Sequence, residues 1–140
     1  SNQPLAPGPE NPESSLRLLE EAAGQCEYAE CALLLAEGAG VNCSDEEGNT
    51  PLLWAVLSGN SEVVKLLLVR GSDVNHRNLD GESALHWAAV TGNLELAALL
   101  LGQGAEVNAR DRFGVTPLKS ALLNEDQEMV GFLKQNGGAL

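Results

Sequence analysis

The stretch that decides the fold is GNTPLLWAV at residues 48–56, which returns 33 residues later as GESALHWAA at residues 81–89. When residues 45–77 are laid over residues 78–110, fourteen positions are identical. Each copy continues into a leucine-rich stretch and then a glycine. A fixed period of this length indicates a repeat protein, in which similar units stack side by side.

The same pattern continues, less regularly, on both sides of these two copies. Thr116-Pro117-Leu118 and Gly137 extend it toward the end of the chain, and Val41-Asn42 extends it backwards. Polar residues replace apolar ones in both outer units, as end units that face water require. We therefore expect a proline-rich linker at 1–11 and then a repeat domain at 12–140, divided into an N-terminal capping repeat at 12–44, repeats at 45–77 and 78–110, and a C-terminal capping repeat at 111–140.

Each unit is predicted to open with a short helix. Thr50 and Thr116 supply a hydroxyl that caps the helix, and the proline after each of them suits the first helical position. Ser83 supplies the same cap without the proline. Gly59 and Gly92 end the helices because glycine adopts the left-handed turn.

A second helix is predicted over 62–70 and again over 95–103, ending before a glycine. The residues after it read as a tight turn or hairpin. Neither helix is long enough to be stable alone, so neighbouring pairs must stack to bury their leucines.

The Thr-Pro-Leu-Leu-Trp-Ala run, its Trp-Ala copy and the Leu-Leu-x-x-Gly-x-x-Val-Asn tails resemble the ankyrin repeat. The resemblance covers residues 12–140. It implies an all-α solenoid of stacked helix-turn-helix units with β-hairpin finger loops. It also implies a non-catalytic module that binds a protein or an extended peptide through a concave groove and the fingers.

Composition excludes several classes of protein. Apolar residues make up 44 % of the 140 residues, and 20 acids against 8 bases give a net charge of −12. Without a cluster of bases we expect no binding of nucleic acid, and without a long apolar run no membrane insertion. The ligand should instead carry Lys or Arg. We expect the chain to be a monomeric domain of a larger protein.

Three cysteines at irregular spacing, Cys26, Cys31 and Cys43, indicate reduced thiols and hence a cytoplasmic or nuclear protein. They do not form a metal-binding pattern, and we expect neither metal nor cofactor. Asp80, Ser83 and His86 invite comparison with a catalytic triad. Ser83 is better explained as a helix cap, and His86 resembles the family's histidine that ties neighbouring turns together, so we expect no enzyme. His76 reads as a lone turn residue.

The predicted binding surface begins with an apolar stripe. Leu57, Val90 and Leu123 recur at the 33-residue step, late in each first helix, and by resemblance they face the groove. Ser58 and Thr91, with Asn124, offer hydrogen bonds beside them. The alternative is that the three apolar side chains tuck under their neighbours.

The finger loops complete this surface. The first two fingers are acidic, and the third is basic and carries an aromatic residue. Leu79 and Phe113 are the expected apolar anchors. Solvated surface charge is the alternative interpretation of the fingers. The charged finger residues predicted to bind the partner are Glu46, Glu47, Asp80, Glu82 and Arg112, with Arg77 and Arg110 adding to the basic end.

Two other functions are kept open. Trp54 and Trp87, expected about 10 Å apart on adjacent helices, could form a methyl-lysine cage with Glu62, as tryptophans do in the ankyrin domains of certain histone lysine methyltransferases. Packing between repeats is the competing role for both indoles. The segment could also be a regulatory or spacer part of a larger enzyme. Asn75 and Asn108 resemble asparagines that are hydroxylated in this family.

Overall fold

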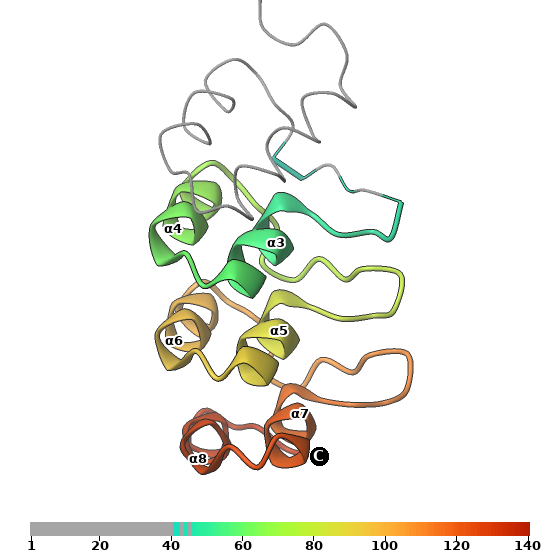
Figure 1. Cartoon of the computed structure of the whole chain (residues 1–140), viewed down its shortest axis with the longest axis vertical. Helices are drawn as coiled ribbons and strands as arrows, with labels where there is room; N and C mark the ends of the chain where they lie inside the picture. The colour runs from blue at the N-terminus through green and yellow to red at the C-terminus, as the bar shows by residue number, and fades with distance from the viewer. Residues whose placement is uncertain (1–40, 43, 45) are drawn as a thin grey trace, which may run out of the picture.

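The computed structural model describes residues 41–42, 44 and 46–140. The predicted linker and most of the first unit lie outside these residues, as do the three cysteines. Within the described residues six helices form three pairs, one in each of the last three predicted units (Figure 1). The helices are α3 (Pro51–Ser58), α4 (Ser61–Val69), α5 (Ala84–Thr91), α6 (Leu94–Gly102), α7 (Pro117–Leu123) and α8 (Gln127–Gln135).

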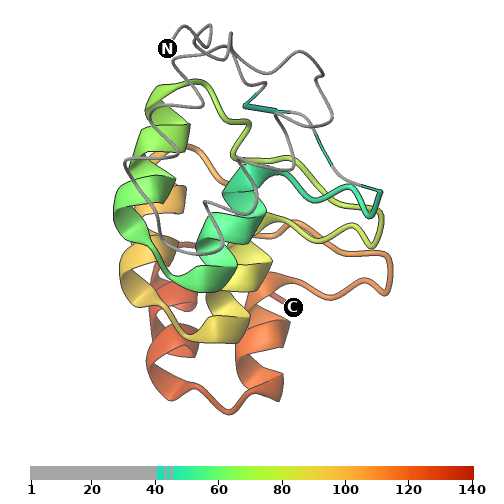
Figure 2. The ribbon, with the colours of Figure 1, turned by 45° about the horizontal axis from the view of Figure 1, so that its top comes forward.

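The helix pairs stack in two columns. The first helices, α3, α5 and α7, form one column and the second helices form the other, while the finger loops project away from the first column (Figure 1). Figure 2, turned by 45°, shows the same stack with its loops on one side. This is the predicted all-α solenoid. The fingers are loops closed by backbone hydrogen bonds, and no strand occurs among the residues that the structure describes.

The helix ends follow the sequence signals. The side chains of Thr50, Ser83 and Thr116 accept hydrogen bonds from backbone N–H groups in the first turns of α3, α5 and α7. Gly59 and Gly92 take left-handed φ values of 78° and 73° and end the first two helices. The predicted capping signals therefore place both ends of these helices correctly.

The second helices begin one residue earlier than predicted. Asn60, Asn93 and Asp126 each accept a hydrogen bond from the backbone N–H group three residues on, so they cap α4, α6 and α8. Helix α4 consequently runs over Ser61–Val69 and α6 over Leu94–Gly102. This second set of caps was missing from the sequence-based prediction.

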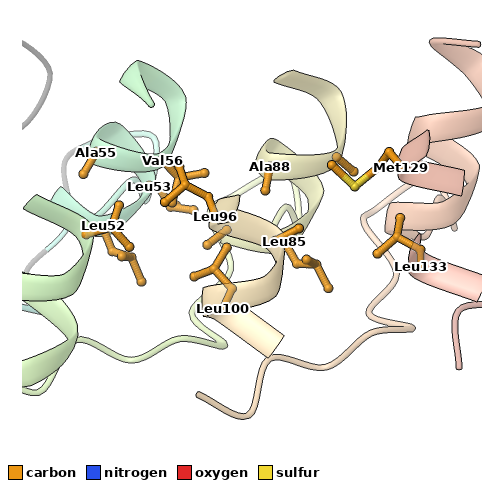
Figure 3. Close-up of a cluster of buried hydrophobic side chains, with 14 of the residues drawn as sticks. Leu52, Leu53, Ala55, Val56, Leu85, Ala88, Leu96, Leu100, Met129 and Leu133 are labelled. Carbon is orange, nitrogen blue, oxygen red and sulfur yellow. The ribbon is translucent and has the colours of Figure 1, made fainter. Parts of the chain in front are cut away.

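The core is shared between repeats. Leu52 and Leu53 of α3, Leu85 of α5, and Leu96 and Leu100 of α6 are at most 1 % exposed. Figure 3 shows side chains from successive repeats meeting in one continuous apolar layer. Because burial of one leucine side chain stabilises by about 1.5–3 kcal/mol, each repeat depends on its neighbours for stability.

An asparagine ladder joins the repeats along their outer turns. The amide nitrogen of Asn75 donates to the Gly104 carbonyl at 3.1 Å, and its amide oxygen accepts from the Glu106 N–H group at 2.8 Å. Asn42 and Asn108 make the same two bonds to the following repeat. One residue type at the 33-residue step therefore fixes the spacing of consecutive turns.

Two histidines tie the finger loops to one another. His86 is 2 % exposed; its Nε2 lies 2.7 Å from the Val115 carbonyl oxygen and its Nδ1 accepts from the Ser83 N–H group. It is thus the link between turns that the resemblance implies. His76 also has a partner, because its Nε2 lies 2.7 Å from the Gly48 carbonyl oxygen, so the interpretation of this histidine as a lone turn residue was wrong.

The fingers lie against each other through their backbones. The N–H group of Leu79 donates to the Glu47 carbonyl at 3.0 Å, and that of Arg112 donates to the Asp80 carbonyl at 2.9 Å. A Cβ atom built on Gly81 would lie only 2.8 Å from the Arg112 nitrogen. Glycine at this position therefore allows the next finger to pack closely.

The last pair differs from the others at two positions. Lys119 is exposed, although it occupies the place where Leu53 and His86 are buried in the preceding units. Glu125 replaces the turn glycine and has φ +56°. The last unit therefore exposes a charged residue at a position that the two preceding units bury.

Candidate partner-binding surface

The solvent-facing side of each first helix is built from three positions at helical spacing, i, i+3 and i+4, which lie on one face. The structure brings the predicted stripe, its polar neighbours and the two tryptophans together on these faces. We call this surface the first-helix face. Its members are Trp54, Leu57 and Ser58 on α3, Trp87, Val90 and Thr91 on α5, and Ser120 and Leu123 on α7, with Asn124 as the C-cap of α7.

The apolar stripe is open to solvent. Leu57 is 47 % exposed, Val90 52 % and Leu123 69 %. The alternative in which they tuck beneath their neighbours therefore does not describe these side chains. Three large apolar side chains in register on an exposed face are typical of a place where a partner can remove them from water.

The indoles of Trp54 and Trp87 pack against each other. Their ring centroids are 6.2 Å apart, closer than the expected 10 Å, and their planes meet at 82°. Both side chains are half-buried and rest on the core. This edge-to-face contact is a favourable packing geometry for two aromatic rings, and it forms a single apolar floor beside the stripe.

The third member of the methyl-lysine cage hypothesis lies on another helix. Glu62 belongs to the first turn of α4, where its carboxylate oxygen lies 3.6 Å from Lys65 Nζ. The packing of the indoles and this ion pair do not favour a cage built from the three residues.

The polar residues of the first-helix face donate to nearby carbonyl groups. The hydroxyl of Ser58 donates to Ala55 at 3.0 Å, and that of Thr91 donates to Trp87 at 2.9 Å. The side-chain amide of Asn124 donates across the repeat boundary to the Val90 carbonyl at 2.6 Å. These three side chains therefore donate hydrogen bonds to backbone carbonyl groups of the protein itself.

Two fingertips carry exposed apolar side chains at the positions predicted to be anchors. Leu79 is 74 % exposed and Phe113 is 72 % exposed. The guanidinium carbon of Arg112 lies 4.7 Å from the centre of the Phe113 ring, and its Nη1 lies 3.1 Å from Asp80 Oδ1. Arg112 and Asp80 thus link the second and third fingers, and the guanidinium of Arg112 lies over the Phe113 ring.

The remaining bases near the fingers brace the fold. Arg77 donates to the Arg110 carbonyl and lies 3.5 Å from the Glu106 carboxylate, while Arg110 donates to the carbonyl groups of Gly114 and Leu140. The predicted basic end of the surface therefore consists of guanidinium groups engaged with neighbouring turns. Its positive charge is offset by Asp80 and Glu106 in the same turns.

The acidic positions differ in how firmly they are held. Glu82 accepts from the Asn78 side chain at 3.0 Å. Glu47 accepts a long 3.5 Å bond from Asn49, and Glu46 is exposed at the tip of the first finger. Together with the net charge of −12, they give the fingertips of the first two repeats a negative potential.

The triad candidates are part of the fold. Ser83 and His86 are 3 % and 2 % exposed and bond to each other at the start of α5. Asp80 is bonded to Arg112 on the neighbouring finger. Neither the hydroxyl nor the imidazole is therefore placed to meet a substrate.

Both predicted hydroxylation sites belong to the asparagine ladder. Asn75 and Asn108 use their amide nitrogen and oxygen in bonds to the next repeat, so their structural role is clear. Hydroxylation of these residues stays a prediction.

The described part of the chain holds neither a membrane-crossing helix nor a cluster of metal-binding side chains. No helix there is both long and apolar enough to cross a bilayer. No group of three or more histidine, cysteine or acidic side chains is placed there to hold a metal ion.

One residue of the surface was missed from the sequence. Ser120 follows Trp54 and Trp87 at the same 33-residue step and lies half-buried on the same face of α7. The 33-residue period could have identified Ser120, because it lies 33 residues after Trp87. At this position of the repeat, the sequence-based prediction used the period for the two tryptophans alone. The apolar floor of indoles therefore covers two repeats and ends at the third.

Comparison with known proteins settles the class. The family model of ankyrin repeats in three copies matches residues 19–111 and 67–139, which together cover most of the chain. The chain belongs to the ankyrin repeat family. Proteins of this family generally bind other proteins, and they are typically not catalysts. None of the curated proteins compared with the chain matches it.

Proposed function

We propose that the chain is a non-catalytic module that binds another protein through the first-helix face and the neighbouring fingertips. The observation that carries this proposal is the exposure of the stripe. Of the eight large apolar side chains exposed in the described residues, five belong to the stripe or to the fingertips. Such a concentration supports a binding role for this side of the molecule.

The charge supports a partner with Lys or Arg. The acidic first and second fingertips attract cationic side chains, while the stripe and the indole floor take apolar ones. The proposal includes a monomeric domain of a larger protein in the cytoplasm or nucleus, without nucleic acid or membrane insertion as part of its function.

Affinity capture from combined cytosolic and nuclear extract tests the proposal. Three baits are compared: the unaltered chain, a stripe variant with Leu57→Ser, Val90→Ser and Leu123→Ser, and a control with Val69→Ser and Leu140→Ser. Val69 and Leu140 are 80 % and 62 % exposed but lie outside the first-helix face. The control therefore removes apolar surface without touching the proposed site.

Proteins retained by the unaltered chain and the control, but lost with the stripe variant, would support the proposal. Equal retention by all three baits would overturn it. Retention of histones dependent on Trp54 and on lysine methylation would favour the cage. A bait that retains nothing would favour a regulatory or spacer segment.

A further inference from the structure

The spacing of the stripe limits the shape of its ligand. Leu57, Val90 and Leu123 occupy the same position of three first helices stacked in one column (Figure 1). Packed helices lie about 8–10 Å apart. A ligand that follows the stripe must therefore present one apolar side chain about every 10 Å, on one side, over about 20 Å.

Extended β structure does not meet this requirement. A strand advances about 3.3 Å per residue and alternates its faces, so the residue 10 Å along points away from the stripe. An α-helix advances about 1.5 Å per residue, and its seventh residue returns to the same side after about 10.5 Å. A polyproline helix also fits, since its third residue returns after about 9.3 Å.

The polar residues beside the stripe distinguish these two ligands. A polyproline helix has no internal hydrogen bonds and leaves its backbone groups for the solvent or the receptor. The hydroxyls of Ser58 and Thr91 are donated to carbonyl groups of their own helices, and Asn124 donates to Val90. The face therefore suits an α-helix, whose backbone groups are already paired within the ligand.

Charge fixes the remaining chemistry of the ligand. The loops that lead into the first helices carry Glu46, Glu47 and Glu82, whereas Arg112 is bonded to Asp80. A helix lying across the three repeats would meet negative charge from the first two fingers on its finger side. Lys or Arg on that side of the ligand would be attracted, and acidic residues would be repelled.

We infer that the partner presents a basic amphipathic α-helix with an apolar residue at every seventh position. The helix crosses the first-helix face with its apolar side on Leu57, Val90 and Leu123 and its basic side toward the fingers. This inference rests on the proposed function and specifies the conformation and register of the ligand.

Three synthetic 22-residue peptides test the inference by fluorescence anisotropy. The first has leucine at positions 4, 11 and 18 in a helical background of alanine, lysine and glutamine. The second has the same composition with leucine at positions 4, 9 and 14, which places them on different sides of a helix. The third is proline-rich and carries leucine at positions 8, 11 and 14. All three carry the same number of lysines.

The first peptide is expected to bind at least about tenfold more tightly than the others. It should lose that advantage with the stripe variant but keep it with the Val69→Ser, Leu140→Ser control. Equal or tighter binding of either other peptide, or no binding of the first, would overturn the inference. The proposed function stands or falls separately, because the capture experiment uses natural partners of any conformation.

Discussion

The turn between α7 and α8 uses the left-handed region without glycine. Gly59 and Gly92 occupy this position in the other described units, with φ values of 78° and 73°, whereas Glu125 has φ +56°. A side chain in this region costs about 1–2 kcal/mol. The last unit of the described chain therefore carries a local strain that the two preceding units avoid.

Replacing Glu125 by glycine should relieve this strain. We expect Glu125→Gly to raise the free energy of unfolding by about 1 kcal/mol, measured by chemical denaturation followed by circular dichroism. Glu125→Ala serves as the control, since it removes the carboxylate but keeps the Cβ atom. A glycine variant no more stable than the alanine variant would contradict this explanation.

Glycine in a finger can be required by a positive φ or by a lack of space for a Cβ atom, and Gly81 and Gly114 distinguish these two reasons. Both have positive φ, 76° and 79°, but only at Gly81 does the next finger occupy the space of a Cβ atom, 2.8 Å away; nothing lies within 4 Å at Gly114. Gly114→Ala should cost about 1 kcal/mol for the backbone alone. Gly81→Ala should lower the melting temperature clearly more than Gly114→Ala does. Equal drops in the melting temperature of the two variants would show that the fingers do not pack this closely.

The elements themselves were largely predictable from the sequence. Hydroxyl caps, prolines and turn glycines are local signals, and they gave the first helices their correct ends. The second helices were placed one residue late because Asn60 and Asn93 were not identified as caps. Asparagine is an equally good cap, so this signal was present and unused.

Links between elements were harder to predict. The hydrogen bond from His76 to Gly48 and the bracing of the fingers by Arg77 depend on where side chains of one repeat meet the backbone of another. A single sequence shows the repeat period, but it does not show which side-chain rotamer contacts the neighbouring repeat. The carbonyl groups that Arg77 and Arg110 contact could not be predicted for this reason.

The asparagine ladder gives a prediction at the scale of neighbouring elements. Asn75→Ala removes two bonds to the next repeat, at 3.1 Å and 2.8 Å. With each worth about 0.5–1.5 kcal/mol, denaturation should show a loss of about 2 kcal/mol. Asn136→Ala is the matched control, because its amide bonds only within its own helix end, to Phe132. Similar losses in the two variants would contradict a role in joining repeats.

Across the whole molecule, the period predicted the order of the units but not the shared face. Sequence reasoning treated Trp54 and Trp87 as a site separate from the stripe. In the structure the ring centroids of the two indoles lie 6.2 Å apart, and both indoles lie on the same helix faces as Leu57 and Val90. The contact depends on how the repeats are rotated on one another, which a 33-residue spacing does not contain.

Core and stripe should respond differently to truncation. Leu96 is wholly buried between the helices of the stack, and Leu96→Ala should cost about 2–5 kcal/mol. The stripe variant changes only exposed side chains and should stay within about 1 kcal/mol of the unaltered chain. Thermal and chemical denaturation of both variants measure this contrast. A large loss in the stripe variant would mean that these residues stabilise the fold.

A protein partner that covers the first-helix face can be detected through the two indoles, because both belong to that face. Trp54 and Trp87 are the only tryptophans of the chain, so labelling with 5-fluorotryptophan gives two fluorine NMR signals, assigned with Trp54→Phe. A partner purified from the capture experiment carries no fluorine. Both signals should change chemical shift when this partner is added, because the partner would cover the two indoles. If binding is verified by a lower diffusion coefficient but both signals keep their positions, the partner does not cover the first-helix face.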